Sequence, residues 1–92
     1  MIVRIMGEGQ WHVDEALITE LNQIDALLDA DLESGAEDRL ASHILAMHGS
    51  IKARGTQVAV EEFVPSDAVV PPAGIAVAEL RRLIGQEGLI PG

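Results

Sequence analysis

Two runs of apolar residues, each repeating at steps of four, three and four along the chain, limit the possible folds more than any other feature. This spacing places every member of a run on one face of an α-helix, because a helix turns once every 3.6 residues. A polar corner at residues 33–35 separates the runs, so we expect an antiparallel helical hairpin. The two apolar stripes are Leu17, Leu21, Ile24 and Leu28, and then Leu40, Ile44, Met47 and Ile51.

Polar residues and a glycine predict the ends of these two helices. Asp14 suits the N-cap of the first helix, where its carboxylate can accept a hydrogen bond from a free backbone N–H group. Ser34 and Glu37 have the spacing of a capping box, which predicts that the second helix starts beside Ser34. Gly55 is expected to end that helix in the left-handed conformation that glycine tolerates.

The remaining segments predict short strands and a third helix. Residues 2–6 and 10–13 have an extended pattern and flank a glycine-containing turn, which predicts an N-terminal β-hairpin. Residues 56–60 and 68–70 are also β-prone. Apolar residues within 77–84 repeat at helical spacing and predict a short third helix.

Chain length and composition complete the expected fold class. Ninety-two residues suffice for one hydrophobic core, so we expect a single domain over residues 1–92. Aromatic residues make up 2% of the chain and hydrophobic residues 48%, so that core must be mainly aliphatic. The predicted class is α+β, with an N-terminal β-hairpin, a long antiparallel helix hairpin, one or two further short strands completing a small antiparallel sheet, and a short C-terminal helix. The apolar residues of 87–92 are expected to dock on the domain.

The charge balance excludes some classes of partner. Fifteen Asp and Glu against six Lys and Arg give a net charge of −9, which would repel the phosphates of a nucleic acid. The same sign opposes direct docking on an anionic membrane, so we expect membrane contact only indirectly, through a partner. The lack of a signal-peptide pattern, of cysteine and of an apolar run near the ~20 residues that span a bilayer predicts a cytoplasmic protein.

The segment Gly7-Glu8-Gly9 raises the question of a phosphate-binding loop. A dinucleotide fingerprint needs a third glycine and a helix directly after it, and a Walker loop needs a Lys followed by Ser or Thr. Here Gln10, Trp11 and an extended segment follow, and the Glu8 carboxylate would lie beside any phosphate. The segment therefore predicts a tight turn rather than a phosphate site.

No residue pattern in the sequence predicts a cofactor, a metal site or catalysis. His43 and His48 are five residues apart on a helix and so point to different faces, and His12 has no ligand spacing to either. None of the serines lies in a G-x-S-x-G elbow. We therefore expect no catalytic residue and no enzymatic activity. A ligand-sensing or hydrolytic domain is the weakest alternative.

The acidic residues of the first helix predict a solvated face. Asp25, Asp29 and Glu33 follow one another at steps of four, and Glu15, Glu20 and Asp31 add to the same acidic character. A straight helix cannot wrap several oxygens around a hard cation as a calcium loop does. We expect the face to meet water, or basic side chains of a partner protein.

Trp11 has two possible roles in a chain with so few aromatic residues. It can be the one large core residue, or it can anchor a protein interface, a frequent role of tryptophan. Its position on a predicted strand, in phase with Val13 and directly after a tight turn, favours the core.

Four segments in order resemble a known family. MIVRIMGEGQW, the acidic L-x-x-L-N-x-I-D helix, VPSDAVVPP and EGLIPG together are similar to the small PspA-associated domain, PspAA, over essentially the whole chain. The resemblance implies a component of the phage-shock, or envelope-stress, response that acts with a PspA-like coiled-coil protein protecting the membrane. It implies no catalytic residue.

The expected function is thus a non-enzymatic adaptor that binds a PspA-like coiled-coil protein and reaches the inner face of the membrane only through it. The alternative is a self-associating module, a homodimer whose surplus apolar surface is covered by its own copy. Residues predicted to contact a partner come from the shared segments and the acidic helix: Glu8, Gln10, Trp11, Asp25, Asp29, Ser66, Asp67, Leu89 and Ile90.

Overall fold

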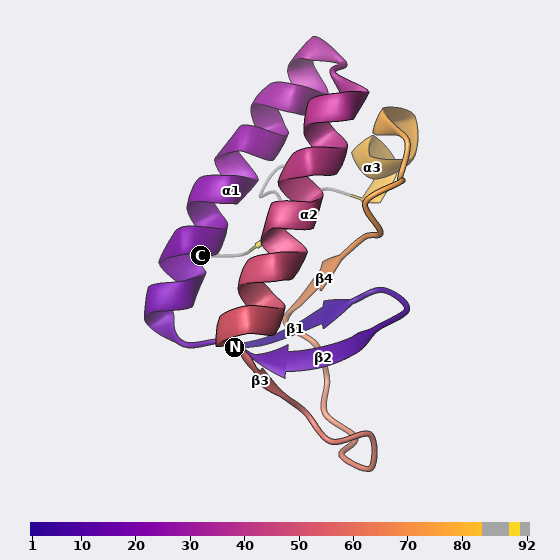
Figure 1. Cartoon of the computed structure of the whole chain (residues 1–92). Helices are drawn as coiled ribbons and strands as arrows, with labels where there is room; N and C mark the ends of the chain where they lie inside the picture. The colour runs from indigo at the N-terminus through magenta and orange to yellow at the C-terminus, as the bar shows by residue number, and fades with distance from the viewer. Residues whose placement is uncertain (84–88, 91–92) are drawn as a thin grey trace.

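A computed structural model describes residues 1–83 and 89–90 of the chain. Two long helices dominate it: α1 spans Glu15–Ser34 and α2 spans Glu37–Arg54. They run antiparallel side by side and stand on one side of a small sheet (Figure 1). Both predicted apolar stripes face inward, with Leu17, Leu21 and Leu28 of α1 packed against the buried side chains of α2. The predicted helical hairpin is confirmed.

The start of α1 follows the prediction, whereas the corner between the helices does not. Asp14 caps α1, and its Oδ1 accepts a hydrogen bond from the Leu17 N–H at 2.8 Å. Ser34 is the last residue of α1 rather than a cap of α2, and α2 begins after Ala36, which has no side-chain oxygen to offer. The predicted capping box is therefore wrong. Gly35 is the C-cap of α1, and its φ of +70° is the left-handed conformation that ends this helix.

Gly55 ends α2 for a different reason from the one predicted. Its φ of −79° is open to any residue, so the predicted left-handed conformation is wrong. The position instead lacks space, because an added Cβ would lie 2.6 Å from the Ile51 carbonyl oxygen and 3.1 Å from that of His12. Glycine is needed at this position so that the end of α2 can approach the sheet closely.

We expect Gly55→Ala to lower the free energy of unfolding by about 1–2 kcal/mol, because the new methyl group must displace backbone oxygens. Gly49→Ala, in the interior of α2, is the matched control. Apart from the adjacent residues and the nearby backbone of α2 itself, no heavy atom of the described residues lies within 4 Å of a Cβ built at Gly49, so this change should stabilise the helix by up to ~1 kcal/mol. Urea denaturation of the two variants checks the opposite signs, and equal effects would contradict the explanation.

Four strands form the sheet in the order β3-β2-β1-β4. β1 (Ile2–Ile5) and β2 (Gly9–His12) form the predicted hairpin, and β3 (Thr56–Gln57) pairs antiparallel with β2. β4 (Ala68–Val70) pairs with β1 in parallel, so the sheet is mixed and the prediction of an antiparallel sheet is wrong at this strand. The connection from β3 passes from one edge of the sheet to the other instead of turning back in a hairpin, which brings β4 in along the direction of β1.

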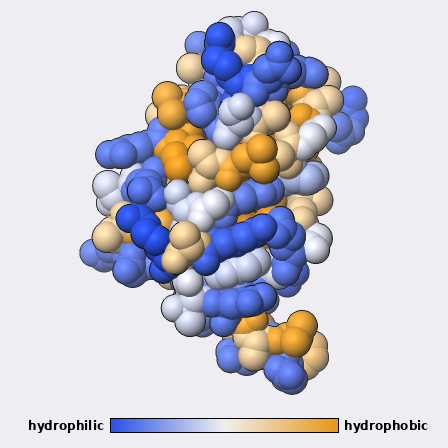
Figure 2. Space-filling view, in the orientation of Figure 1, coloured by the Kyte–Doolittle hydropathy of each residue, from blue (hydrophilic) through white to orange (hydrophobic). Residues whose placement is uncertain are grey.

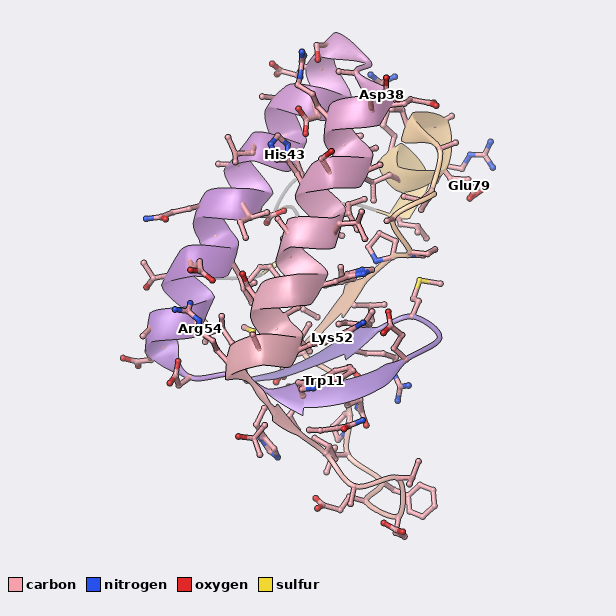
Figure 3. The ribbon with its side chains drawn as sticks, in the orientation of Figure 1. Trp11, Asp38, His43, Lys52, Arg54 and Glu79 are labelled. Atoms are coloured by element: carbon pink, nitrogen blue, oxygen red, sulfur yellow. The ribbon has the colours of Figure 1, made fainter. Side chains whose placement is uncertain are left out.

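The core lies between the helices and one face of the sheet. Trp11 is 6% exposed and lies beneath the C-terminal end of α2 (Figure 3), which confirms its predicted place in the core. The short helix α3 (Val77–Leu83) contributes buried Val77 and Leu80. Leu89 and Ile90 are buried as well, in agreement with the predicted docking of this segment, while residues 84–88 and 91–92 of the predicted third helix and tail lie outside the described residues.

In the described part of the chain, no helix combines the length and the apolar character needed to span a membrane.

Candidate interaction surface

The connection between β3 and β4, residues 58–67, is named the 58–67 loop. It passes along the sheet face that is turned away from the helices and projects from the body at the bottom of Figure 1. Gln10 holds its base: the Gln10 carbonyl accepts the Val58 N–H at 2.9 Å, and the Gln10 side-chain amide donates to Val64 O at 2.9 Å and Ser66 Oγ at 2.8 Å. The side chain of Gln10 is thereby buried, and the loop is tied to β2.

The far end of the loop is connected to β1. The Asp67 N–H donates to the Ile2 carbonyl at 2.7 Å, and Asp67 Oδ2 accepts the Ile2 N–H at 2.8 Å. Ser66 and Asp67, both predicted partner contacts, therefore have a role within the chain. Together with Gln10 they fix both ends of the 58–67 loop against the sheet.

The middle of the loop presents two apolar side chains to solvent. A turn closed by the Glu62 N–H and the Ala59 carbonyl, 3.0 Å apart, brings the chain around. Val60 is 92% exposed and Phe63 97% exposed, far more than any other large apolar residue in the described part of the chain. We call these two residues the loop tip. Figure 2 shows the hydrophobic colouring on the lobe that projects below the body.

A hollow lies between the 58–67 loop and the outer face of the hairpin. It has a volume of about 720 Å³ and is lined by residues 58–64 on the loop side and by Arg4, Glu8, Gln10 and Gln57 on the sheet side. Val58, Val60, Phe63 and Val64 give the loop side an apolar character. The hollow and the loop tip thus form one continuous surface.

The charge around this surface is mainly negative. Glu8, Glu61 and Glu62 line the hollow against the single cation Arg4, and the sequence has no Lys or Arg between Gly55 and Leu80. Lys52 of α2 forms an ion pair with Glu8 (Figure 3 labels Lys52), and this hydrogen bond holds the pKa of Glu8 below its ordinary value. Glu8, a predicted contact residue, remains ionised and partly exposed at the rim.

Asp25 corrects the prediction of a solvated acidic face. Its side chain is buried, and its carboxylate accepts the Leu89 N–H at 3.1 Å with both oxygens and the Ile90 N–H at 3.1 Å with Oδ2. Burial raises the pKa of Asp25 above its ordinary value. The contact joins the middle of α1 to the segment that contains Leu89 and Ile90, so these three predicted partner contacts have a structural role.

The sequence contained a signal for this position. Asp25 lies four residues after Leu21 and three before Leu28, on the apolar stripe itself. A carboxylate at this position is expected to be buried and to accept hydrogen bonds. The residues near Asp25 in the sequence do not reveal which groups donate them.

Asp31 is the second exception on α1. It is buried where the two helices meet, with Arg39 Nε 3.5 Å from its Oδ1 and His43 Nδ1 in contact with its Oδ2 (Figure 3 labels His43). Glu20 pairs with Arg54 of α2 at 2.7 Å. Asp29 and Glu33 are exposed as predicted, so the solvated part of the acidic face is smaller than expected.

The histidines lie apart, as their spacing predicts. His43 contacts Asp31, whereas His48 is buried with Nε2 2.8 Å from the Pro71 carbonyl. Among residues 1–83 and 89–90, no group of three or more His, Asp or Glu side chains is arranged to hold a metal ion.

The loop tip is the feature that the sequence analysis missed. Residues 56–60 were expected to form a strand, but β3 ends at Gln57 and Val60 lies in a turn. The available signal was Phe63, the only phenylalanine, which stands between two glutamates and a Val-Pro step in a segment too short for a helix. An isolated aromatic residue of this kind is more typical of a contact surface than of a core.

Comparison with known proteins identifies the chain by its sequence. The family model described as PspA-Associated protein, PspAA, matches residues 1–92, the whole chain. Searches of curated proteins and of solved structures each gave no match. This match over the full length agrees with the order of segments seen in the sequence. The chain belongs to the PspA-associated protein family, PspAA.

Proposed function

We propose that this protein is a non-enzymatic adaptor that binds a PspA-like coiled-coil protein in the envelope-stress response. The observation that carries the proposal is the family match over residues 1–92, because the family is named for an association with PspA. The structure supports it with a firmly held surface that projects an exposed aromatic residue, a feature typical of binding proteins.

In this proposal the protein works in the cytoplasm and reaches the membrane only through its partner. Its net charge of −9 favours a partner with basic side chains and disfavours direct contact with anionic lipid. Asp29 is the predicted contact residue best placed for such a partner, since its side chain is exposed, whereas the partly exposed Glu8 carboxylate is already paired with Lys52. Gln10, Ser66 and Asp67 contribute by holding the loop, and Trp11, Asp25, Leu89 and Ile90 by maintaining the fold.

Size-exclusion chromatography with light scattering tests the proposal. The purified protein is run alone, with a purified PspA-like protein, and with that protein at high salt. We expect a complex that elutes together and persists in part at high salt, because apolar burial is insensitive to screening while charge attraction weakens. Separate elution in both salts would overturn the proposal. A dimeric mass for the protein alone, with no complex, would favour the self-associating alternative.

A further inference from the structure

The loop tip exposes two large apolar side chains, which is unusual in so small a domain. The chain has two aromatic residues, and folding buries Trp11 while leaving Phe63 97% exposed next to an almost fully exposed Val60. Single exposed apolar residues are ordinary on protein surfaces. In this loop Val60 lies in the turn closed by Ala59 and Glu62, Phe63 directly follows that turn, and both residues border the same hollow as Val58 and Val64.

The loop is also held ready for binding. The Gln10 amide, the Asp67 backbone and carboxylate, and the Glu62 to Ala59 turn fix its base, its end and its bend. A loop already held in one conformation loses less entropy when a partner covers it. The hydrogen bonds that hold the loop do not serve to place Val60 and Phe63 in the described core, because neither side chain packs against it.

The charges beside the loop tip limit what can cover it. Glu61 and Glu62 lie between Val60 and Phe63 in the sequence, and no Lys or Arg occurs from Gly55 to Leu80. Glu8 and Arg4 line the same hollow from the sheet side, where Glu8 is already paired with Lys52, so the excess negative charge comes from Glu61 and Glu62. An anionic lipid surface would be repelled by these carboxylates. A protein surface with an apolar centre and basic edges complements this region, because its centre can cover the apolar loop tip and its edges can pair with the glutamates beside it.

We infer that the loop tip is the anchor by which this protein binds a helix of its partner, a helix whose apolar stripe is flanked by Lys or Arg. The apolar stripe lies against Val60, Phe63 and the loop side of the hollow, and the basic flank faces Glu61 and Glu62. Amphipathic helices commonly bind into apolar grooves in this way. This inference rests on the proposed function, since it names the contact within the proposed complex.

Affinity measurements with the full chain and a purified PspA-like protein test the anchor. Phe63→Ser should weaken binding about thirtyfold, the loss typical of an aromatic anchor, while Phe63→Leu keeps most of the affinity. Leu45→Ser is the matched control, because Leu45 is an apolar residue 58% exposed on α2, away from the loop. Its affinity should stay within about twofold of that of the unchanged protein. Thermal unfolding should be unchanged for the two Phe63 variants, because Phe63 lies outside the core and outside any helix, and only slightly lowered for Leu45→Ser, which replaces a good helix former within α2.

A second pair of measurements identifies the occupant. Glu61→Lys with Glu62→Lys should weaken binding and remove most of its salt dependence. A photoreactive phenylalanine analogue at position 63 should cross-link to a partner peptide that has helical apolar spacing with adjacent Lys or Arg, and the same analogue at position 45 should not. Binding of the protein to anionic vesicles that requires Phe63 would overturn the inference in favour of lipid.

The outcomes separate this inference from the proposed function. If the unchanged protein forms the complex and Phe63→Ser binds equally well, the loop tip is not the anchor and only this inference fails. If the unchanged protein forms no complex, both fail.

Discussion

Replacing Trp11 with alanine is expected to lower the free energy of unfolding by about 3–5 kcal/mol, because the largest buried side chain of the sheet is lost. Trp11 is 6% exposed on β2, pairs with Val3 of β1 and Gln57 of β3, and lies against the end of α2 near Gly55. Its removal leaves a cavity where three strands and a helix meet. Small domains have free energies of unfolding of about 5–15 kcal/mol, so this substitution removes a large part of the total stability.

Urea denaturation followed by far-ultraviolet circular dichroism measures this loss. Trp11 is the only tryptophan, so the variant has no tryptophan fluorescence to follow. Phe63→Ala is the matched control, since it truncates the other aromatic residue at an exposed position and should change stability by no more than about 0.5 kcal/mol. Similar losses for the two variants would show that burial of Trp11 is not what stabilises the junction.

Replacing Asp25 with alanine is expected to lower the free energy of unfolding by about 2–3 kcal/mol at neutral pH. The buried Leu89 and Ile90 N–H groups lose their acceptor, and each unsatisfied group costs about 1–3 kcal/mol. Relief of the cost of burying the carboxylate offsets part of that loss. Hydrogen exchange should also become faster at the Leu89 and Ile90 amides, which urea denaturation alone would not show.

Asp29→Ala is the control for that substitution. Asp29 lies one turn further along α1 and is exposed, so its loss should change stability by no more than about 0.5 kcal/mol. An equal loss of stability in the two variants would mean that the negative charge of α1, rather than the contact of Asp25 with Leu89 and Ile90, determines the effect.

The pH dependence of the Asp25 contribution has a definite sign. Because burial raises the pKa of Asp25 in the folded state, the folded chain binds this proton more tightly than the unfolded chain. The contribution of Asp25 to stability therefore falls as pH rises through the window between the unfolded pKa and the raised folded pKa. The stability of the unchanged protein relative to Asp25→Asn should decrease across that window, and an increase would contradict the raised pKa.

Features set by neighbouring residues could be predicted from the sequence. The two helices follow from apolar spacing, the hairpin from the glycine turn, the cap from Asp14, and the burial of Trp11 from its phase along β2. Each of these needs only residues that lie within a few positions of one another.

Features that depend on distant segments could not be predicted. The parallel pairing of β4 depends on the path of the 58–67 loop across the sheet, and the burial of Asp25 depends on donors 64 and 65 residues away. The loop tip was missed because its exposure is set by how Gln10, also remote in sequence, holds the loop. The proposed class of partner comes from the family resemblance, because no single residue indicated it.

The pairing of β1 with β4 has a consequence for the order in which the chain can fold during synthesis. The helical hairpin depends on nearby residues and can form early, whereas β1 receives its parallel neighbour only when residues 68–70 have been made. Asp25 must wait longer still, for residues 89 and 90. A nascent chain that stops before these residues keeps a sheet edge and an ionised carboxylate uncovered on otherwise apolar surfaces. Chains that end earlier would therefore be recognisable to proteases, and the core closes only after residues 89 and 90 have been made.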